Sequence, residues 1–132
     1  MKTFARLTLI SLLLLIAAPA YSASGLQALQ IFVCEFNDDA TAEDVMAMAS
    51  AWLKAAKTMP GGKNMQAFIR FPVAEGQSDE GDFRFVISTP TFAEWGQFTD
   101  AYEGSAAAKI DDEWDNLSDC GESSIWEGIF IE

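Results

Sequence analysis

Two arginines on opposite arms of an expected β-hairpin, Arg70 and Arg84, could together bind an anion. They flank an acidic loop, residues 75–82, in a chain of 20 acidic and 8 basic residues. If Arg70 faces Arg84, then Phe68 faces Val86, and each strand keeps its alternation of side chains. Like charges that face each other across a strand pair are unfavourable. A negative group is therefore expected near the two arginines.

That negative group has two possible sources. One is a carboxylate ligand in a pocket, and arginine suits it because its planar fork makes two parallel hydrogen bonds. The other, which we expect, is an acidic side chain of the protein itself. Losing Arg70 from a buried pair would cost about 3–5 kcal/mol, whereas losing it from a ligand site would abolish binding. The expected pocket residues are Phe32, Phe36 and Phe68, and the candidate internal acids are Glu35, Glu94, Asp100 and Glu127.

A second cluster of charge is the acidic run Asp111, Asp112, Glu113, Asp115 and Asp119. Positions 111, 115 and 119 would stack on one face of a helix, where like charges repel. A hard cation such as calcium would relieve this repulsion, since it prefers oxygen ligands. No EF-hand spacing is present, so a solvated acidic face is expected and no metal site is predicted.

The chain contains no histidine. This excludes Ser-His-Asp and Cys-His catalysis, histidine-bound zinc and histidine-ligated haem. No cofactor is predicted, and the residues by themselves assign no catalytic group.

The first 23 residues are typical of a cleaved export signal. Lys2 and Arg6 precede an apolar stretch, Leu7–Ala18, that is shorter than the roughly 20 residues of a membrane span. Without residues 1–23, six bases and 20 acids remain, a net charge of −14. We therefore expect a periplasmic or secreted protein that binds neither nucleic acid nor an anionic membrane. Residues 24–132 are expected to form one domain.

The two cysteines, Cys34 and Cys120, fit this location. An even pair in an oxidising compartment predicts a disulfide. Two buried free thiols are the alternative.

Hydrophobic periodicity predicts the order strand, helix, strand, strand, helix, strand. Pro72 in the second strand indicates a sheet edge, and a Gly104-Ser105 break divides the second helical region. This order predicts a ferredoxin-like α+β fold with sheet order 4-1-3-2 and both helices on one face. The expected elements are a strand over 26–36, a helix from Thr41, strands over 65–73 and 83–88, a helix from Thr91, and a strand over 124–131.

The stretch DFRFVISTPTFAEWGQFTDAYEGSAAAKIDDEW resembles the dimeric α+β barrel superfamily, which includes antibiotic-biosynthesis monooxygenase-like, EthD-like and NIPSNAP-like proteins. It joins a strand to an aromatic-rich helix, a Gly-Ser break and a helix of small residues. The resemblance implies two units packed sheet against sheet, with pockets between sheet and helices. Members include cofactor-independent oxygenases, haem-degrading enzymes and proteins without known activity. The haem branch relies on histidine, which is absent here, and no catalytic residue carries over.

Three functions follow as hypotheses. The first is binding of a small hydrophobic or carboxylate-bearing molecule without catalysis. The second is a cofactor-independent monooxygenase or isomerase. The third is a structural or partner-binding dimer. In each case we expect a homodimer through the sheet face opposite the helices, with Phe32, Phe36, Phe68 and Val86 on that face, because monomers rarely expose large apolar patches.

Overall fold

A computed structural model describes residues 26–74 and 81–129. The expected export signal lies outside the described residues, as do residues 75–80 of the hairpin loop and residues 130 and 131 of the last strand. The elements, in chain order, are β1 (Leu26–Phe36), α1 (Ala42–Ala56), β2 (Gln66–Arg70), β3 (Phe83–Thr89), α2 (Phe92–Asp100), α3 (Ala106–Trp114) and β4 (Ser118–Ile129).

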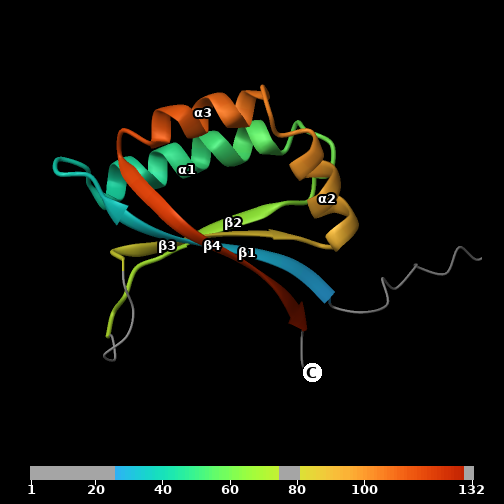
Figure 1. The fold of residues 1–132 in the computed structure, drawn as a ribbon, viewed down its shortest axis with the longest axis horizontal. Coiled ribbons are helices and arrows are strands. Elements are labelled where there is room, and N and C mark those ends of the chain that lie inside the picture. Colours follow the sequence, from blue (N-terminus) through green and yellow to red (C-terminus); the bar gives the residue numbers. More distant parts are fainter. Residues whose placement is uncertain (1–25, 75–80, 130–132) are drawn as a thin grey trace, which may run out of the picture.

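The strands form one antiparallel sheet in the order β2-β3-β1-β4. All three helices lie on the same side of this sheet, and α1 and α3 run side by side above it (Figure 1). The predicted ferredoxin-like α+β fold, with strand order 4-1-3-2 and helices on one face, is therefore confirmed.

The hairpin of β2 and β3 has the predicted register. Arg70 faces Arg84, Phe68 faces Val86, and Gln66 is opposite Ser88. The strand β2 lies at the edge of the sheet and ends two residues before Pro72, which agrees with the position inferred from that proline.

Side-chain caps start each helix. The Thr41 hydroxyl accepts the Asp44 N–H, and the Asp44 carboxylate accepts the Thr41 N–H at 3.0 Å, which completes a capping box. Thr91 caps α2, and Ser105 caps α3 directly after Gly104, whose φ of 71° ends the preceding turn. The predicted helix break at Gly104-Ser105 is confirmed.

Gly61, in the turn after α1, lies against the backbone of α2. Its φ is 73°, and a Cβ at this position would lie 2.0 Å from the Glu94 carbonyl oxygen. Only glycine permits this approach of one backbone to another. The turn thereby holds α2 close to the end of α1.

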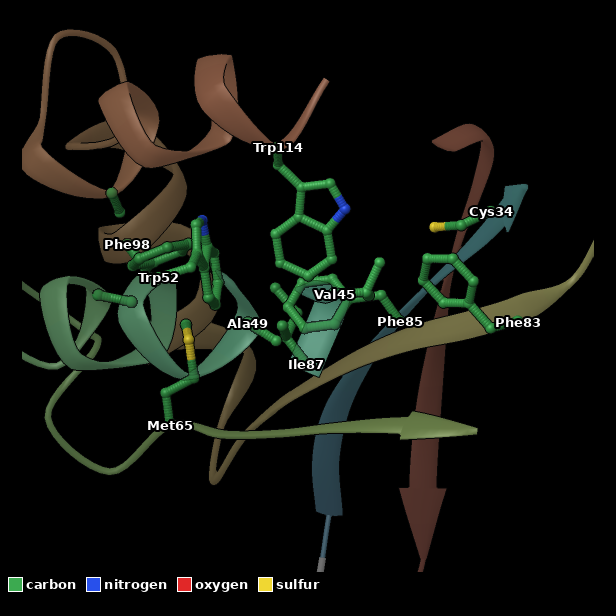
Figure 2. Packing of buried hydrophobic residues seen from close by; sticks show 12 residues of the cluster. Cys34, Val45, Ala49, Trp52, Met65, Phe83, Phe85, Ile87, Phe98 and Trp114 are labelled. Atoms are coloured by element: carbon green, nitrogen blue, oxygen red, sulfur yellow. The ribbon is translucent and has the colours of Figure 1, made fainter. Parts of the chain in front are cut away.

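The core fills the space between the sheet and the helices (Figure 2). The Trp52 ring meets Phe85 edge-on at 5.3 Å between centroids, and Trp114 lies 4.7 Å from the same ring. The Trp114 indole N–H donates to the Ser118 hydroxyl, so this buried polar group is satisfied. Within the described ranges, every buried side-chain nitrogen and oxygen has a hydrogen-bond partner.

A disulfide joins Cys34 of β1 to Cys120 of β4, as predicted, with 4.1 Å between the Cα atoms. The pairing of these strands shifts between Val33 and Glu35, opposite the second cysteine. Such a bulge twists an antiparallel pair locally. The disulfide therefore links β1, an inner strand of the sheet, to the edge strand β4.

The strand β4 begins at Ser118, six residues earlier than predicted. The polar sequence Ser-Asp-Cys-Gly-Glu-Ser resembles a loop, but Ser118 pairs with Phe36 and Asp119 with Glu35. Tertiary pairing next to the disulfide overrides the local polarity. The predicted stacking of Asp119 with Asp111 and Asp115 on one helix is consequently wrong.

The register also assigns the two sheet faces. Phe85 packs on Trp52 of α1, so Phe32, which pairs with Phe85, points to the helices as well. The alternating residues point away from the helices and form what we call the outer sheet face: Leu29, Ile31 and Val33 of β1, Gln66, Phe68 and Arg70 of β2, Arg84, Val86 and Ser88 of β3, and Glu122, Ser124 and Trp126 of β4.

None of the helices in the described part of the chain has both the length and the apolar character needed to cross a bilayer.

Candidate functional site

The arginine pair lies on the outer sheet face. Arg84 is half-buried, and its Nη1 donates to the Phe83 carbonyl at 3.3 Å. Arg70 is exposed, with its guanidinium 5.6 Å from the centre of the Phe68 ring. Because Arg70 is exposed, the loss expected from breaking a buried ion pair does not apply to it.

Three of the four acids proposed as internal partners lie on the wrong side of the sheet. Glu94 and Asp100 belong to α2, and Glu94 is engaged by the Asn64 amide at 2.9 Å. Glu127 pairs with the buried Ala28 on the face toward the helices. Glu35 alternates with Cys34 and is the one acid of that set on the outer side.

The predicted grouping of Phe32 and Phe36 with the arginines is wrong. Phe36 stacks with Phe71 and Phe83 in the core, and Phe32 stacks with Phe85, all on the helix side. The sequence of β1 is apolar at nearly every position, so alternation could not show which of its faces met the helices. Of the aromatic residues proposed, only Phe68 shares a face with the arginines.

A different site lies between the sheet and the second helical region. A hollow of about 860 Å³ opens there, and we call it the helix-side hollow. Its deep walls are aromatic, and four of these rings are nearly fully buried (Figure 2). The residues lining it include Gln30, Phe32, Trp52, Phe85, Ile87, Phe98, Thr99, Tyr102, Ala108, Trp114 and Cys120.

The rim of this hollow is acidic. Five carboxylate residues line it against one base, Lys109. The strand β4 supplies Asp119, which thus joins the α3 acids at the rim although it is not on their helix. The acids are Glu103, Asp111, Asp112, Asp115 and Asp119.

Tyr102 connects the aromatic wall to the acidic rim. Its hydroxyl accepts the Trp52 indole N–H at 2.9 Å. Burial raises the pKa of Tyr102 well above its ordinary value, and the charges of Asp111 and Asp112 raise it further, so the phenol stays protonated. The hydroxyl can therefore donate a hydrogen bond toward the rim or to a ligand.

Partial burial of the Asp111 carboxyl at the rim also raises its pKa. A hydrogen bond from Tyr102 opposes this effect, while the charges of Asp115 and Asp112 add to it. The negative charges of neighbouring acids thus destabilise the ionised form of Asp111. A nearby positive group would stabilise it.

We expect Tyr102→Phe to lower the free energy of unfolding by about 1–3 kcal/mol, because the part-buried Trp52 N–H loses its acceptor. Denaturant unfolding of the two proteins measures this loss. Thr58→Ala is the control: it removes the exposed Thr58 hydroxyl that donates to the Ala55 carbonyl, a bond that water replaces, and should cost less than about 0.5 kcal/mol. Equal losses in the two variants would contradict the structural role given to Tyr102.

No group of three or more acidic, cysteine or histidine side chains converges into a possible metal site within residues 26–74 and 81–129. The rim acids are therefore spread around an opening and do not gather around a point.

The arrangement defines an α+β protein of ferredoxin-like plan with a hollow between sheet and helices. No family model matches the chain, and no curated protein matches it. A solved structure of the hydroxynitrile lyase from Passiflora edulis matches with a TM-score of 0.53 and 11% identity, over 83% of this chain and 96% of the lyase.

Two further solved structures, each titled a dimeric ferredoxin-like protein of unknown function, are also similar. The one from Thermobifida fusca YX has a TM-score of 0.48 and 19% identity, over 80% of this chain and 92% of its own. The one from Bacteroides fragilis NCTC 9343 has a TM-score of 0.43 and 12% identity, over 80% and 97%. At such identities the likeness is one of fold.

The resemblance implied pockets between sheet and helices, but most residues of the helix-side hollow could not be predicted because they come from six separate elements. The sequence predicts the acids on a solvated helix face and does not indicate that they border an aromatic wall. The aromatic residues and the acids lie around one hollow because the chain changes direction at Gly104, between α2 and α3. One sequence feature could have indicated the hollow: Trp95, Phe98 and Tyr102 are clustered shortly before the acidic run that begins at Asp111.

Proposed function

We propose that residues 24–132 form an exported domain that binds a small, largely apolar molecule in the helix-side hollow. The observation that carries this proposal is the hollow itself, with its aromatic wall beneath a charged rim. Its volume of about 860 Å³ is within the range of about 300–1,000 Å³ common for ligand sites.

An apolar ligand fits the hollow better than a carboxylate does. Arg70 and Arg84, the groups proposed to hold a carboxylate, lie on the outer sheet face. The hollow presents acids at its rim, and an anion there would meet repulsion. A carboxylate-bearing ligand would have to bind at the arginines instead.

Export is supported by two features. The sequence begins with a segment typical of an export signal, and the Cys34–Cys120 disulfide suits an oxidising compartment such as the periplasm or the exterior. N-terminal sequencing of the protein recovered outside the cytoplasm tests this part. A mature chain that still starts at Met1 would contradict it.

Catalysis by a cofactor-independent mechanism, as in a monooxygenase or isomerase, is the alternative. The observation that favours it is the position of Tyr102 and Asp111 in the lining of the hollow, where the Asp111 carboxylate could accept a proton and the Tyr102 hydroxyl could donate a hydrogen bond to the substrate.

A blocking substitution tests the binding proposal. We expect Thr99→Trp, at the exposed mouth of the hollow on α2, to weaken binding of the neutral fluorophore N-phenyl-1-naphthylamine by about tenfold or more, because the indole occupies ligand volume. Fluorescence titration at fixed protein concentration measures the dissociation constant.

Gln97→Trp is the matched control, since it makes the same change on the same helix at an exposed position that does not line the hollow. It should bind as the unchanged protein does. If the fluorophore fails to saturate, or if both variants bind equally, the helix-side hollow is not the binding site.

A further inference from the structure

The charge around the helix-side hollow indicates which apolar molecules it takes. Glu103, Asp111, Asp112, Asp115 and Asp119 line the hollow, and Lys109 is the one base among its lining residues. Asp111 and Asp112 lie near the end of α3, and Asp115 is its C-cap residue. Their carboxylates repel one another, and an uncharged ligand would not change that repulsion. A ligand with a positive end would reduce that repulsion.

The wall of the hollow also suits a cation. Phe32 and Tyr102 are the half-buried rings of the lining, and both present part of their surface to the hollow. An ammonium group near an aromatic face is attracted by the ring quadrupole, and the attraction grows as water is excluded. Tyr102 adds a hydroxyl oxygen between the wall and the rim.

We propose that the ligand of the helix-side hollow is a primary amine or a quaternary ammonium compound with an aromatic or aliphatic body, held with its apolar part against the half-buried rings of Phe32 and Tyr102 and its cation at Asp111. This inference rests on the binding function proposed above and specifies its ligand class. The raised pKa of Asp111 agrees with it, since a carboxyl that lacks favourable charge partners gains most from a cation.

Three probes of similar size separate ligand charge from ligand shape: 2-phenylethylamine, 2-phenylethanol and 3-phenylpropionate. By isothermal titration calorimetry near neutral pH and at low salt, we expect the amine to bind about tenfold more tightly than the alcohol, with the carboxylate weakest. The preference for the amine should shrink at high salt.

Paired variants locate the charge effect. Asp111→Asn should reduce amine affinity by about threefold to tenfold while leaving alcohol affinity unchanged. Asp39→Asn makes the same change at an exposed position of the turn before α1 that does not line the hollow, and it should leave both affinities unchanged. A circular dichroism spectrum equal to that of the unchanged protein shows that each variant is folded.

The outcomes are distinct. Equal binding of amine and alcohol, or tightest binding of the carboxylate, overturns the amine inference and leaves hollow binding intact. Equal effects of Asp111→Asn and Asp39→Asn overturn the assignment of the cation to the rim. If none of the three probes binds, and the neutral fluorophore also fails to bind, the binding function falls together with the inference.

Discussion

The Cys34→Ala/Cys120→Ala variant should lose about 4–5 kcal/mol of its free energy of unfolding. The disulfide closes a loop with a sequence separation of 86, and the chain-entropy model assigns this much to a loop of that length. Small domains are stable by only about 5–15 kcal/mol. The midpoint of thermal unfolding should fall by roughly 20–30 °C.

Thermal and denaturant unfolding of the oxidised protein and the variant measure this loss. Alanine suits the fully buried Cys34 position because it leaves no polar group to satisfy. Reducing the unchanged protein should produce the same loss, and the variant should be insensitive to reductant. Two alkylatable thiols in the native exported protein would refute the disulfide in its natural setting.

Trp126→Lys should convert a homodimer into a monomer. Trp126 is 57% exposed and Phe68 38% exposed on the outer sheet face, where Leu29, Ile31 and Val33 are only half-buried. A single soluble chain rarely leaves so continuous an apolar patch open. We propose that a second copy covers it, and that a lysine at Trp126 weakens the dimer by about 30-fold or more.

The charges on this face suit a second copy. Along one row, Arg70 and Arg84 lie on the β2 and β3 side and Glu122 lies on β4. In a two-fold dimer whose axis runs parallel to the strands, Arg70 and Arg84 of one copy would lie over Glu122 of the other. Such an arrangement would supply the negative group expected beside the two arginines.

Sedimentation equilibrium at micromolar concentration measures the assembly. Met46→Lys is the matched control because Met46 is 50% exposed on α1, in the helix layer, and its replacement should leave the dimer unchanged. An unchanged protein that sediments as a monomer would contradict the dimer. Dimer loss in both variants would show that the outer sheet face is not the specific interface.

Local chemistry explains which parts of the fold could be predicted from the sequence. Thr41 and Thr91 mark helix starts because a hydroxyl can satisfy a free backbone N–H. The alternation of residues in β2 and β3 predicts their faces, and with them the Arg70–Arg84 pairing. The two cysteines could be paired because the strand order brings the ends of β1 and β4 together.

The remaining features depend on contacts between distant segments. The strand β1 is apolar on both faces, so the side taken by Phe32 and Phe36 follows from the packing of Trp52 on Phe85. The early start of β4 at Ser118 follows from its pairing with Phe36. The helix-side hollow requires the relative placement of α2 and α3, which no local pattern contains.

The disulfide also determines how the protein responds to mechanical force. Leu26 and Ile129 are paired neighbours, so tension applied between them opens the β1–β4 ladder one residue pair at a time, from Leu26 toward Val33. Unzipping stops at the covalent bond between Cys34 and Cys120, which then carries the load. The segment between these cysteines, which includes α1, α2 and α3, is shielded from the pull. Gln30 and Phe32, which line the helix-side hollow from β1, precede Cys34 and are held in place by the pairing of β1 with β3. Under tension the edge strand β4 can therefore peel away from β1 as far as the disulfide, while β1 stays paired with β3 and the rest of the domain stays folded.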